Sequence, residues 1–240
     1  MKKYVLVFML TLALTLVTGI LLYERCREDR VGISEYEEIR VMASVADEVA
    51  QEDIVLPNID ETMLARENRD YAAWIYIPGT AINYPVVLPE NNDFYLARTF
   101  RKEKNVCGCL FFDAGTDSLF SSLNTVIHGH NMKSGAMFGG LKLYLQETYA
   151  VEHPYMYIYS NGEWEKYRFI SVYRTSFQDV FPYQTVFFSA EDFRKYVNAV
   201  KIKNIVKTEE DDEKEINNMV TLSTCYGKKE KLIVQWAAQK

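Results

Sequence analysis

The run at residues 5–23, VLVFMLTLALTLVTGILLY, has no charged side chain, and it constrains the fold of this chain more than any other feature. As a helix the run would be roughly 28 Å long, which is close to the hydrocarbon thickness of a bilayer. The following sequence, YERCRED, lacks the small residues of a signal-peptidase cleavage site. We therefore predict a single transmembrane signal anchor that is not cleaved.

The charges at the start of the chain predict its orientation. Lys2 and Lys3 precede the apolar run, and positively charged flanks of a membrane span tend to stay in the cytoplasm. We expect residues 1–4 to be a cytoplasmic stub and everything after Tyr23 to lie on the extracellular side of the cell membrane.

Composition excludes one class of partner and favours one class of core. The 240 residues carry a net charge of −6 without a basic stripe, so no nucleic-acid partner is expected. Aromatic residues make up 14% of the chain, which suits a β-rich core. The length allows one sizeable domain with accessory segments.

The four cysteines do not have the spacing of a disulfide framework. Cys107 and Cys109 flank one glycine, Cys26 adjoins the apolar run, and Cys225 lies far along the chain. No histidine or second cysteine pair lies beside Cys107 and Cys109 to complete a zinc site. We predict no metal and no cofactor, and we expect at least one thiol to be kept for chemistry.

The pattern beyond the apolar run predicts a helical segment followed by a β-rich domain. Apolar residues at helical spacing predict a helix over 33–53, and a short helix follows at 61–66. We assign residues 24–69 to a helical juxtamembrane segment and 70–240 to the main domain. The runs that predict strands are 72–87 (two strands broken at Pro78-Gly79), 109–113, 124–129, 155–160, 165–175, 218–225 and 231–238.

Few helices interrupt these strands. One is predicted at 137–147, and another at 191–201, where Ser189 and Asp192 have the spacing of a helix cap. The acidic stretch TEEDDEKE at 208–215 predicts a solvated loop. Many short strands with few helices indicate a mainly β fold, either a barrel or a sandwich.

The strand TLSTC at 221–225 ends on a thiol. Side chains alternate along a strand, so Thr221, Ser223 and Cys225 share one face. A lone cysteine usually packs as a small buried hydrophobe, whereas a cysteine beside a general base can be a nucleophile for acyl transfer. His128 and His130, in VIHGHNM at a strand end, are the candidate bases, and His153 is expected to be structural.

Together these motifs resemble the sortase family. The carriers are TLSTC before a final apolar strand and GHNM about a hundred residues earlier, supported by RDYAAWIYIPGTAINYPVV, NNDFYLARTF, GCLFFD and GAMFGGLKLY. The late helix in FFSAEDFRKYVNAVKIKN resembles that of class B members. The similarity extends over about residues 70–236.

The resemblance implies a closed or nearly closed sortase-type β-barrel with a few peripheral helices. It also implies a membrane-anchored cysteine transpeptidase of Gram-positive bacteria. Cys225 would attack a C-terminal sorting signal of an exported protein and form a thioacyl intermediate, and His130 would be the acid/base. An amine of a peptidoglycan cross-bridge precursor would then accept the acyl group.

Three positions qualify this assignment. Lys231 stands where sortases place an arginine at the start of the strand after the cysteine, and lysine keeps the charge without the planar fork. His128 occupies a position that is usually not histidine in the family. Ser223 shares a face with Cys225, so its hydroxyl is either a substrate contact or satisfied by its neighbours.

Two other functions remain open at this point. The absent arginine is compatible with a degenerate sortase fold that binds sorting signals without turning them over. A pilin-polymerising sortase is the other alternative, although the sequence has no lid-like segment before the barrel and no second apolar span.

Overall fold

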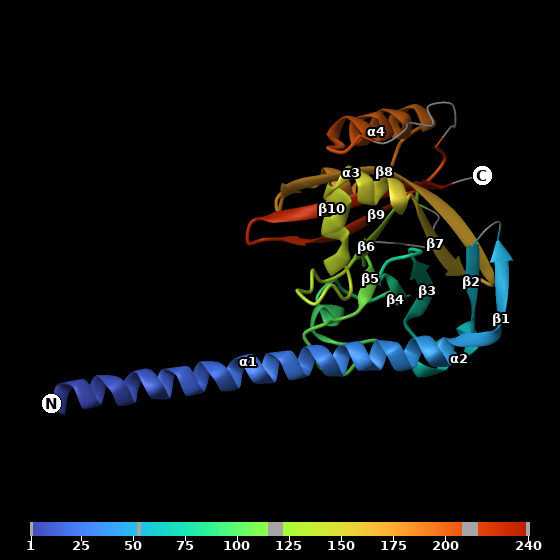
Figure 1. The fold of residues 1–240 in the computed structure, drawn as a ribbon. Coiled ribbons are helices and arrows are strands. Elements are labelled where there is room, and N and C mark those ends of the chain that lie inside the picture. The colour runs from blue at the N-terminus through green and yellow to red at the C-terminus, as the bar shows by residue number, and fades with distance from the viewer. Residues whose placement is uncertain (1, 52–53, 115–121, 208–215, 239–240) are drawn as a thin grey trace.

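The chain folds into a β-barrel approached by one very long helix (Figure 1). The structure is a computed structural model that describes residues 2–51, 54–114, 122–207 and 216–238. The predicted acidic loop at 208–215 lies outside the described residues.

Eight strands close the barrel in the order β10-β8-β7-β3-β4-β5-β6-β9. The bounds are β3 (Tyr71–Tyr76), β4 (Asn83–Val87), β5 (Leu110–Phe112), β6 (Asn124–His128), β7 (Tyr155–Ser160), β8 (Glu163–Ser176), β9 (Met219–Tyr226) and β10 (Glu230–Ala238). Each lies where the sequence predicts a strand, and the predicted barrel is confirmed.

Two of the neighbouring pairs in the barrel are parallel, namely β4 with β5 and β6 with β9. The remaining neighbours pair antiparallel. The parallel pairing of β6 with β9 brings the carboxyl ends of the two motif-bearing strands to the same end of the barrel. The interior is filled by apolar side chains such as Phe112, Leu222 and Trp236, which are completely buried.

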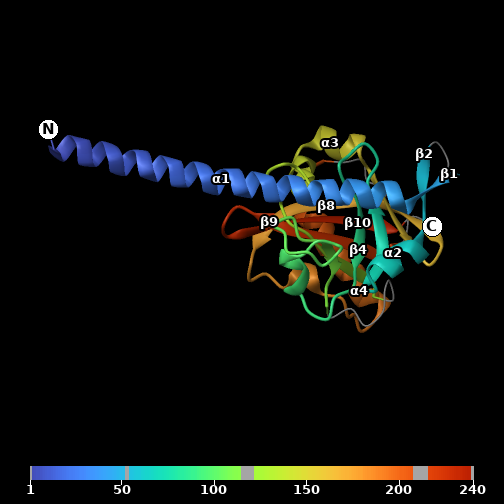
Figure 2. The same cartoon turned by 90° about the horizontal axis from the view of Figure 1, so that it is seen from below.

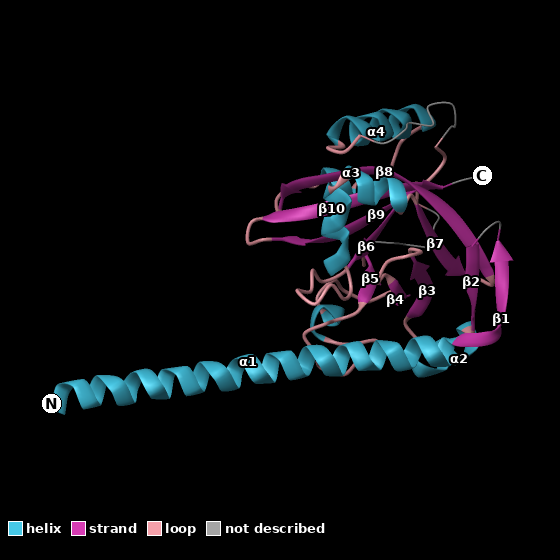
Figure 3. Ribbon diagram, viewed as in Figure 1, coloured by secondary structure: helices cyan, strands magenta, loops and turns pink. Residues whose placement is uncertain are grey.

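Helices lie at the periphery of the barrel (Figure 3). They are α2 (Glu61–Glu67), α3 (Glu147–Glu152) and α4 (Ala190–Lys203), with 3-10 helices η1 (Phe94–Ala97), η2 (Gly139–Leu145) and η3 (Phe181–Tyr183). The predicted cap of α4 is present, because Ser189 Oγ accepts from Asp192 N at 3.1 Å. Helix α4 packs on the outer face of the barrel through a separate cluster that includes Phe193 and Val200.

The prediction of a 137–147 helix is wrong in detail. Met137 has a positive φ of 52°, which is incompatible with the first turn of an α-helix. Gly139 packs so closely on the Met132 backbone that an added Cβ would meet Met132 O at 2.3 Å. These two features delay the helix and tighten it into η2, and the α-helical turn α3 follows only at Glu147.

Helix α1 (Lys2–Ala43) is unbroken from the apolar run to the barrel. The predicted helix over 33–53 is wrong beyond Ala43, where strand β1 (Ser44–Gln51) begins and pairs with β2 (Ile54–Ile59). In a longer helix the Ala43 carbonyl would accept from a residue four positions later. It accepts instead from Asp60 N at 2.9 Å, so backbone pairing with a distant segment ends the helix.

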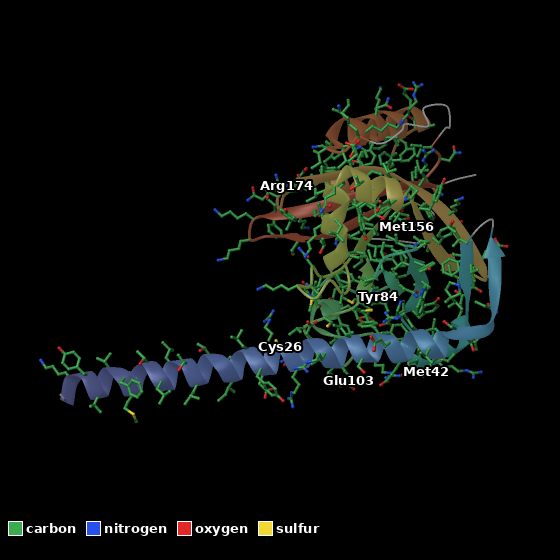
Figure 4. All side chains as sticks on the ribbon, viewed as in Figure 1. Cys26, Met42, Tyr84, Glu103, Met156 and Arg174 are labelled. Carbon is green, nitrogen blue, oxygen red and sulfur yellow. The ribbon has the colours of Figure 1, made fainter. Side chains whose placement is uncertain are left out.

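The two halves of α1 have different surroundings. The apolar half is long enough to cross a membrane and none of its apolar window is buried in the fold. Figure 2 shows this half projecting past the barrel while the other half runs along it. In Figure 4 the side chains before Cys26 point outward, whereas the second half of the helix runs beside the part of the barrel that carries Tyr84, a β4 residue whose ring meets that of Tyr36 edge to face.

Candidate active site

Cys225 is exposed at the carboxyl end of β9. The alternate residues Val220 and Leu222 of the same strand pack into the barrel interior. Strand alternation therefore directs Thr221, Ser223 and Cys225 to the outer face of the sheet. The thiol is thus not packed as a core residue.

The segment that carries the histidines runs directly beside Cys225. Gly129 N donates to Ser223 O at 3.2 Å, which extends the parallel pairing by one residue beyond β6. Thr224 Oγ1 donates to Gly129 O at 2.7 Å, and Asn131 Nδ2 donates to Cys225 O at 2.7 Å. These three bonds flank His130 on both sides and fix its backbone against the end of β9.

His130 is half-buried, and its ring is oriented by a backbone carbonyl. Its Nε2 lies 2.5 Å from Leu96 O, at the end of η1. A carbonyl oxygen only accepts hydrogen bonds, so this contact assigns a hydrogen to Nε2. Nδ1 is then the nitrogen that is left to take or give a proton.

Lys231, the second residue of β10, lies directly opposite Cys225 in the antiparallel register. Directly paired residues direct their side chains to the same face. The Lys231 ammonium lies 4.4 Å from the centre of the Tyr183 ring and 5.9 Å from that of Phe177. A cation is therefore held by aromatic faces on the side of the sheet that carries the thiol.

Arg174 on β8 does not take the place of this lysine. It is paired with Leu232, the residue after Lys231, so its side chain leaves the sheet on the opposite face. Its guanidinium lies 5.4 Å from the centre of the Tyr226 ring and 3.7 Å from the carboxylate of Glu230.

Ser223 is buried and its hydroxyl has a partner. Ser223 Oγ and Tyr183 OH are 2.9 Å apart, and Tyr183 belongs to η3. Ser223 precedes Cys225 by two residues on β9 and lies on the same face of the sheet. The Lys231 ammonium contacts the ring of the same tyrosine, Tyr183. The Tyr183 hydroxyl thus satisfies the Ser223 hydroxyl.

His128 has a different environment from His130. Its Nε2 lies 2.9 Å from Asp113 Oδ2, and its ring stacks on Tyr183 with centroids 5.8 Å apart. Asn92 Nδ2 donates to the same carboxylate oxygen at 3.2 Å. The His128 imidazole is therefore paired with the Asp113 carboxylate and lies against Tyr183.

The third histidine, which the sequence predicts to be structural, contacts a backbone carbonyl. His153 Nδ1 contacts Pro78 O at 3.0 Å, and its ring lies against Gly79, which has a positive φ of 73°.

Several contributors to the site escaped sequence reasoning. Asn131 follows His130 in the GHNM motif, so its position was a usable signal. Leu96 and Asp113 lie in NNDFYLARTF and GCLFFD, which supported the resemblance without pointing to these two residues, and Tyr183 lies in a segment without a motif. Only the closed barrel brings them to this end.

The comparisons with known proteins identify the family. A family model described as the sortase domain matches residues 75–239. Sortase B of Listeria monocytogenes is 34% identical over 167 residues, which cover 68% of this chain and 65% of that protein. Sortase B of Staphylococcus aureus is 26% identical over 94% of this chain and 91% of its own.

A solved structure extends the likeness to three dimensions. Sortase B of Bacillus anthracis, determined in complex with AAEK1, superposes with a TM-score of 0.76 at 26% identity, covering 89% of this chain and 99% of that one. With the matching family domain over more than half of the sequence, the chain belongs to the sortase family of cysteine transpeptidases.

Proposed function

We propose that this chain is a membrane-anchored, class B-like sortase that cleaves a C-terminal sorting signal of exported proteins and joins them to a peptidoglycan precursor amine. One observation carries the proposal: the exposed Cys225 thiol at the end of β9 lies beside the His130 segment, to which it is tied through Asn131 and Thr224. The family resemblance supplies the substrate class.

In the proposed reaction the thiol of Cys225 loses its proton to His130 Nδ1 and attacks the carbonyl carbon at the cleavage point. The carbon–nitrogen bond of the signal breaks, and the imidazolium returns the proton to the leaving amine. A thioester to Cys225 remains. The acceptor amine attacks this thioester, its proton passes to the imidazole, and the thiol is regenerated.

Two side chains are proposed to assist. The Lys231 ammonium, opposite Cys225, stabilises the negative charge that develops on the attacked carbonyl oxygen. The Ser223 hydroxyl, now paired with Tyr183, is proposed to contact the substrate on the same outer face of the sheet.

Membrane attachment is proposed from α1. Its apolar half is exposed over its whole length, which is unfavourable in water and favourable in a bilayer. With residues 1–4 in the cytoplasm, as Lys2 and Lys3 favour, the barrel lies on the extracellular side.

The test uses the full chain in detergent micelles with a panel of sorting-signal peptides and an amine acceptor. Mass spectrometry should show both the released carboxyl-terminal fragment and the acyl–amine product. Cys225→Ala and His130→Ala should each abolish both products while circular dichroism stays unchanged. Peptide binding by the parent without cleavage and without labelling of Cys225 by a thiol-reactive analogue would instead favour a sorting-signal binder.

A further inference from the structure

The second half of α1 packs against the loop that holds His130. Asn105 Nδ2 donates to Glu28 O at 2.9 Å. A Cβ added at Gly32 would lie 2.6 Å from Asn105 Oδ1 and 2.7 Å from Cys107 Sγ, so the helix backbone touches the loop directly. The anchor helix is therefore part of the wall behind this loop.

Tyr36 of α1 forms two hydrogen bonds with backbone atoms of the segment at 100–108. It is buried, its hydroxyl donates to Gly108 O at 2.6 Å, and the hydroxyl oxygen accepts from Phe100 N at 3.2 Å. Burial raises the pKa of Tyr36 well above its usual value. The side chain therefore stays a hydroxyl donor at every working pH.

The backbone of Gly108 in turn packs directly against the His130 ring. Its φ is +60°, and an added Cβ would meet His130 Cδ2 at 2.9 Å and Tyr95 O at 2.7 Å. Cys109 N donates to Tyr95 O at 3.0 Å, which ties Gly108 to the residue before Leu96. The Gly108 backbone thus lies behind the ring, and η1, which the Cys109–Tyr95 bond ties to this loop, supplies the carbonyl that binds Nε2.

We propose that Tyr36 is a positioning residue for His130: by holding the Gly108 carbonyl, it fixes the backbone surface against which the imidazole rests. The proposal rests on the proposed role of His130 as the acid/base. It makes the membrane-proximal helix a working part of the active site in addition to an anchor.

The test compares Tyr36→Phe with Ile39→Val in the full chain in micelles. Tyr36→Phe removes only the hydroxyl, so the ring still fills its space. Ile39 is buried on the same helix, one turn away, and its change to valine removes one methylene while the Tyr36 hydroxyl and its bond to Gly108 O stay in place. Tyr36→Phe should lower kcat about tenfold with KM within about twofold, as expected for a small displacement of a reacting group. Ile39→Val should lower the melting temperature and leave kcat at the parent value.

A second measurement does not depend on turnover. The chain has 3 histidines, so ring-labelled samples give few signals, which His128→Gln and His153→Gln assign. In Tyr36→Phe the His130 ring resonance should move while those of His128 and His153 stay in place. Gly108→Ala, which crowds the ring from the same side, should move the same resonance.

The outcomes separate the two proposals. An unmoved His130 resonance, or an equal loss of kcat in Ile39→Val, would overturn the role of Tyr36. Cleavage by Cys225→Ala at the parent rate would overturn the proposed function, and the resonance measurement would still decide whether Tyr36 positions the ring.

Discussion

Lys231 and Cys225 face each other directly across the β9–β10 pairing, and the lysine ammonium rests on the ring of Tyr183. The cation is therefore placed by two constraints that do not depend on substrate, namely the strand register and an aromatic face. A flexible lysine held in this way loses less freedom when it meets a developing negative charge.

The first prediction concerns that lysine. Lys231→Gln should lower turnover roughly a hundredfold, since loss of one oxyanion donor costs on the order of 3 kcal/mol. Peptide binding should weaken much less. Lys231→Arg should keep or raise activity, because the fork offers two bonds. Steady-state cleavage of one accepted peptide measures both, with Lys228→Ala and Lys229→Ala in the exposed turn as unaffected controls. Full activity of Lys231→Gln would leave the oxyanion partner unidentified.

The second prediction separates the two histidines at the end of β6. His128 is engaged with Asp113 and stacked on Tyr183. His128→Ala should therefore retain cleavage within about tenfold, less than the roughly hundredfold or greater loss expected for a group that transfers the proton. Asp113→Asn should behave alike, because it changes the same pair. If His128→Ala is inactive and His130→Ala active in the same assay, the base has been assigned to the wrong ring.

The third prediction concerns the thiols. Burial, with the nearby carboxylate of Asp29 as a second cause, raises the pKa of Cys107 to about 12, and burial raises that of Cys109 to about 12. At pH 8 each is then ionised in about one molecule in ten thousand. Iodoacetamide at pH 8 should label exposed Cys225 and Cys26 in the native protein, and label Cys107 and Cys109 only after unfolding.

Peptide mapping by mass spectrometry gives the labelled positions. Rapid native labelling of Cys109 would contradict the packing described for the loop behind His130, since that thiol is about 1% exposed.

The fourth prediction is a pH dependence of stability. Burial opposes ionisation of Asp70, but hydrogen bonds from Tyr95 OH at 2.6 Å and from Lys102 at 3.0 Å outweigh it and lower its pKa. A lowered folded pKa stabilises the fold above the unfolded value, about 3.9, and this stabilisation is lost as pH falls through the folded value.

Asp70→Asn should therefore cost about 1 kcal/mol at pH 7, since the carboxylate is partly exposed, and little at pH 2. Urea unfolding at the two pH values measures the difference. Asp93→Asn, on an exposed turn of the same region, serves as the matched control. An equal loss at both pH values would show that shape, not charge, matters at Asp70.

The eight barrel strands and the helix cap at Ser189 were predictable because their signals are local, whereas β1 and β2 were not predicted, since β1 falls in a stretch with apolar residues at helical spacing. Alternation along 221–225 gave the face of Cys225, and the cap spacing gave the start of α4. The end of α1 was not predictable, because the bond between Ala43 and Asp60 joins segments that no local pattern connects. The same holds for Tyr183 under Lys231, since only the closed barrel brings η3 to that face.

At position 231 the residue type and the strand were predictable from the sequence, but the residue opposite it was not. The sequence located a cation at the start of the last strand, and the strand is found there. Its place opposite Cys225 depends on how many residues the intervening turn uses, which sets the register of the pair.

The continuity of α1 also fixes the distance between the membrane-spanning run and the barrel. In the membrane-anchored protein that we propose, the apolar run ends at Tyr23, and contact with the barrel begins at Glu28, whose carbonyl is bound by Asn105. The helix between these two residues rises about 7.5 Å. A flexible linker of the same length would instead allow the distance between the barrel and the membrane to vary. The Cys225 thiol is consequently held at a fixed distance from the membrane surface. A substrate anchored in the same bilayer must present its cleavage point at that distance from the membrane. The fold therefore restricts the length of the spacer between the substrate's cleavage point and its own membrane anchor.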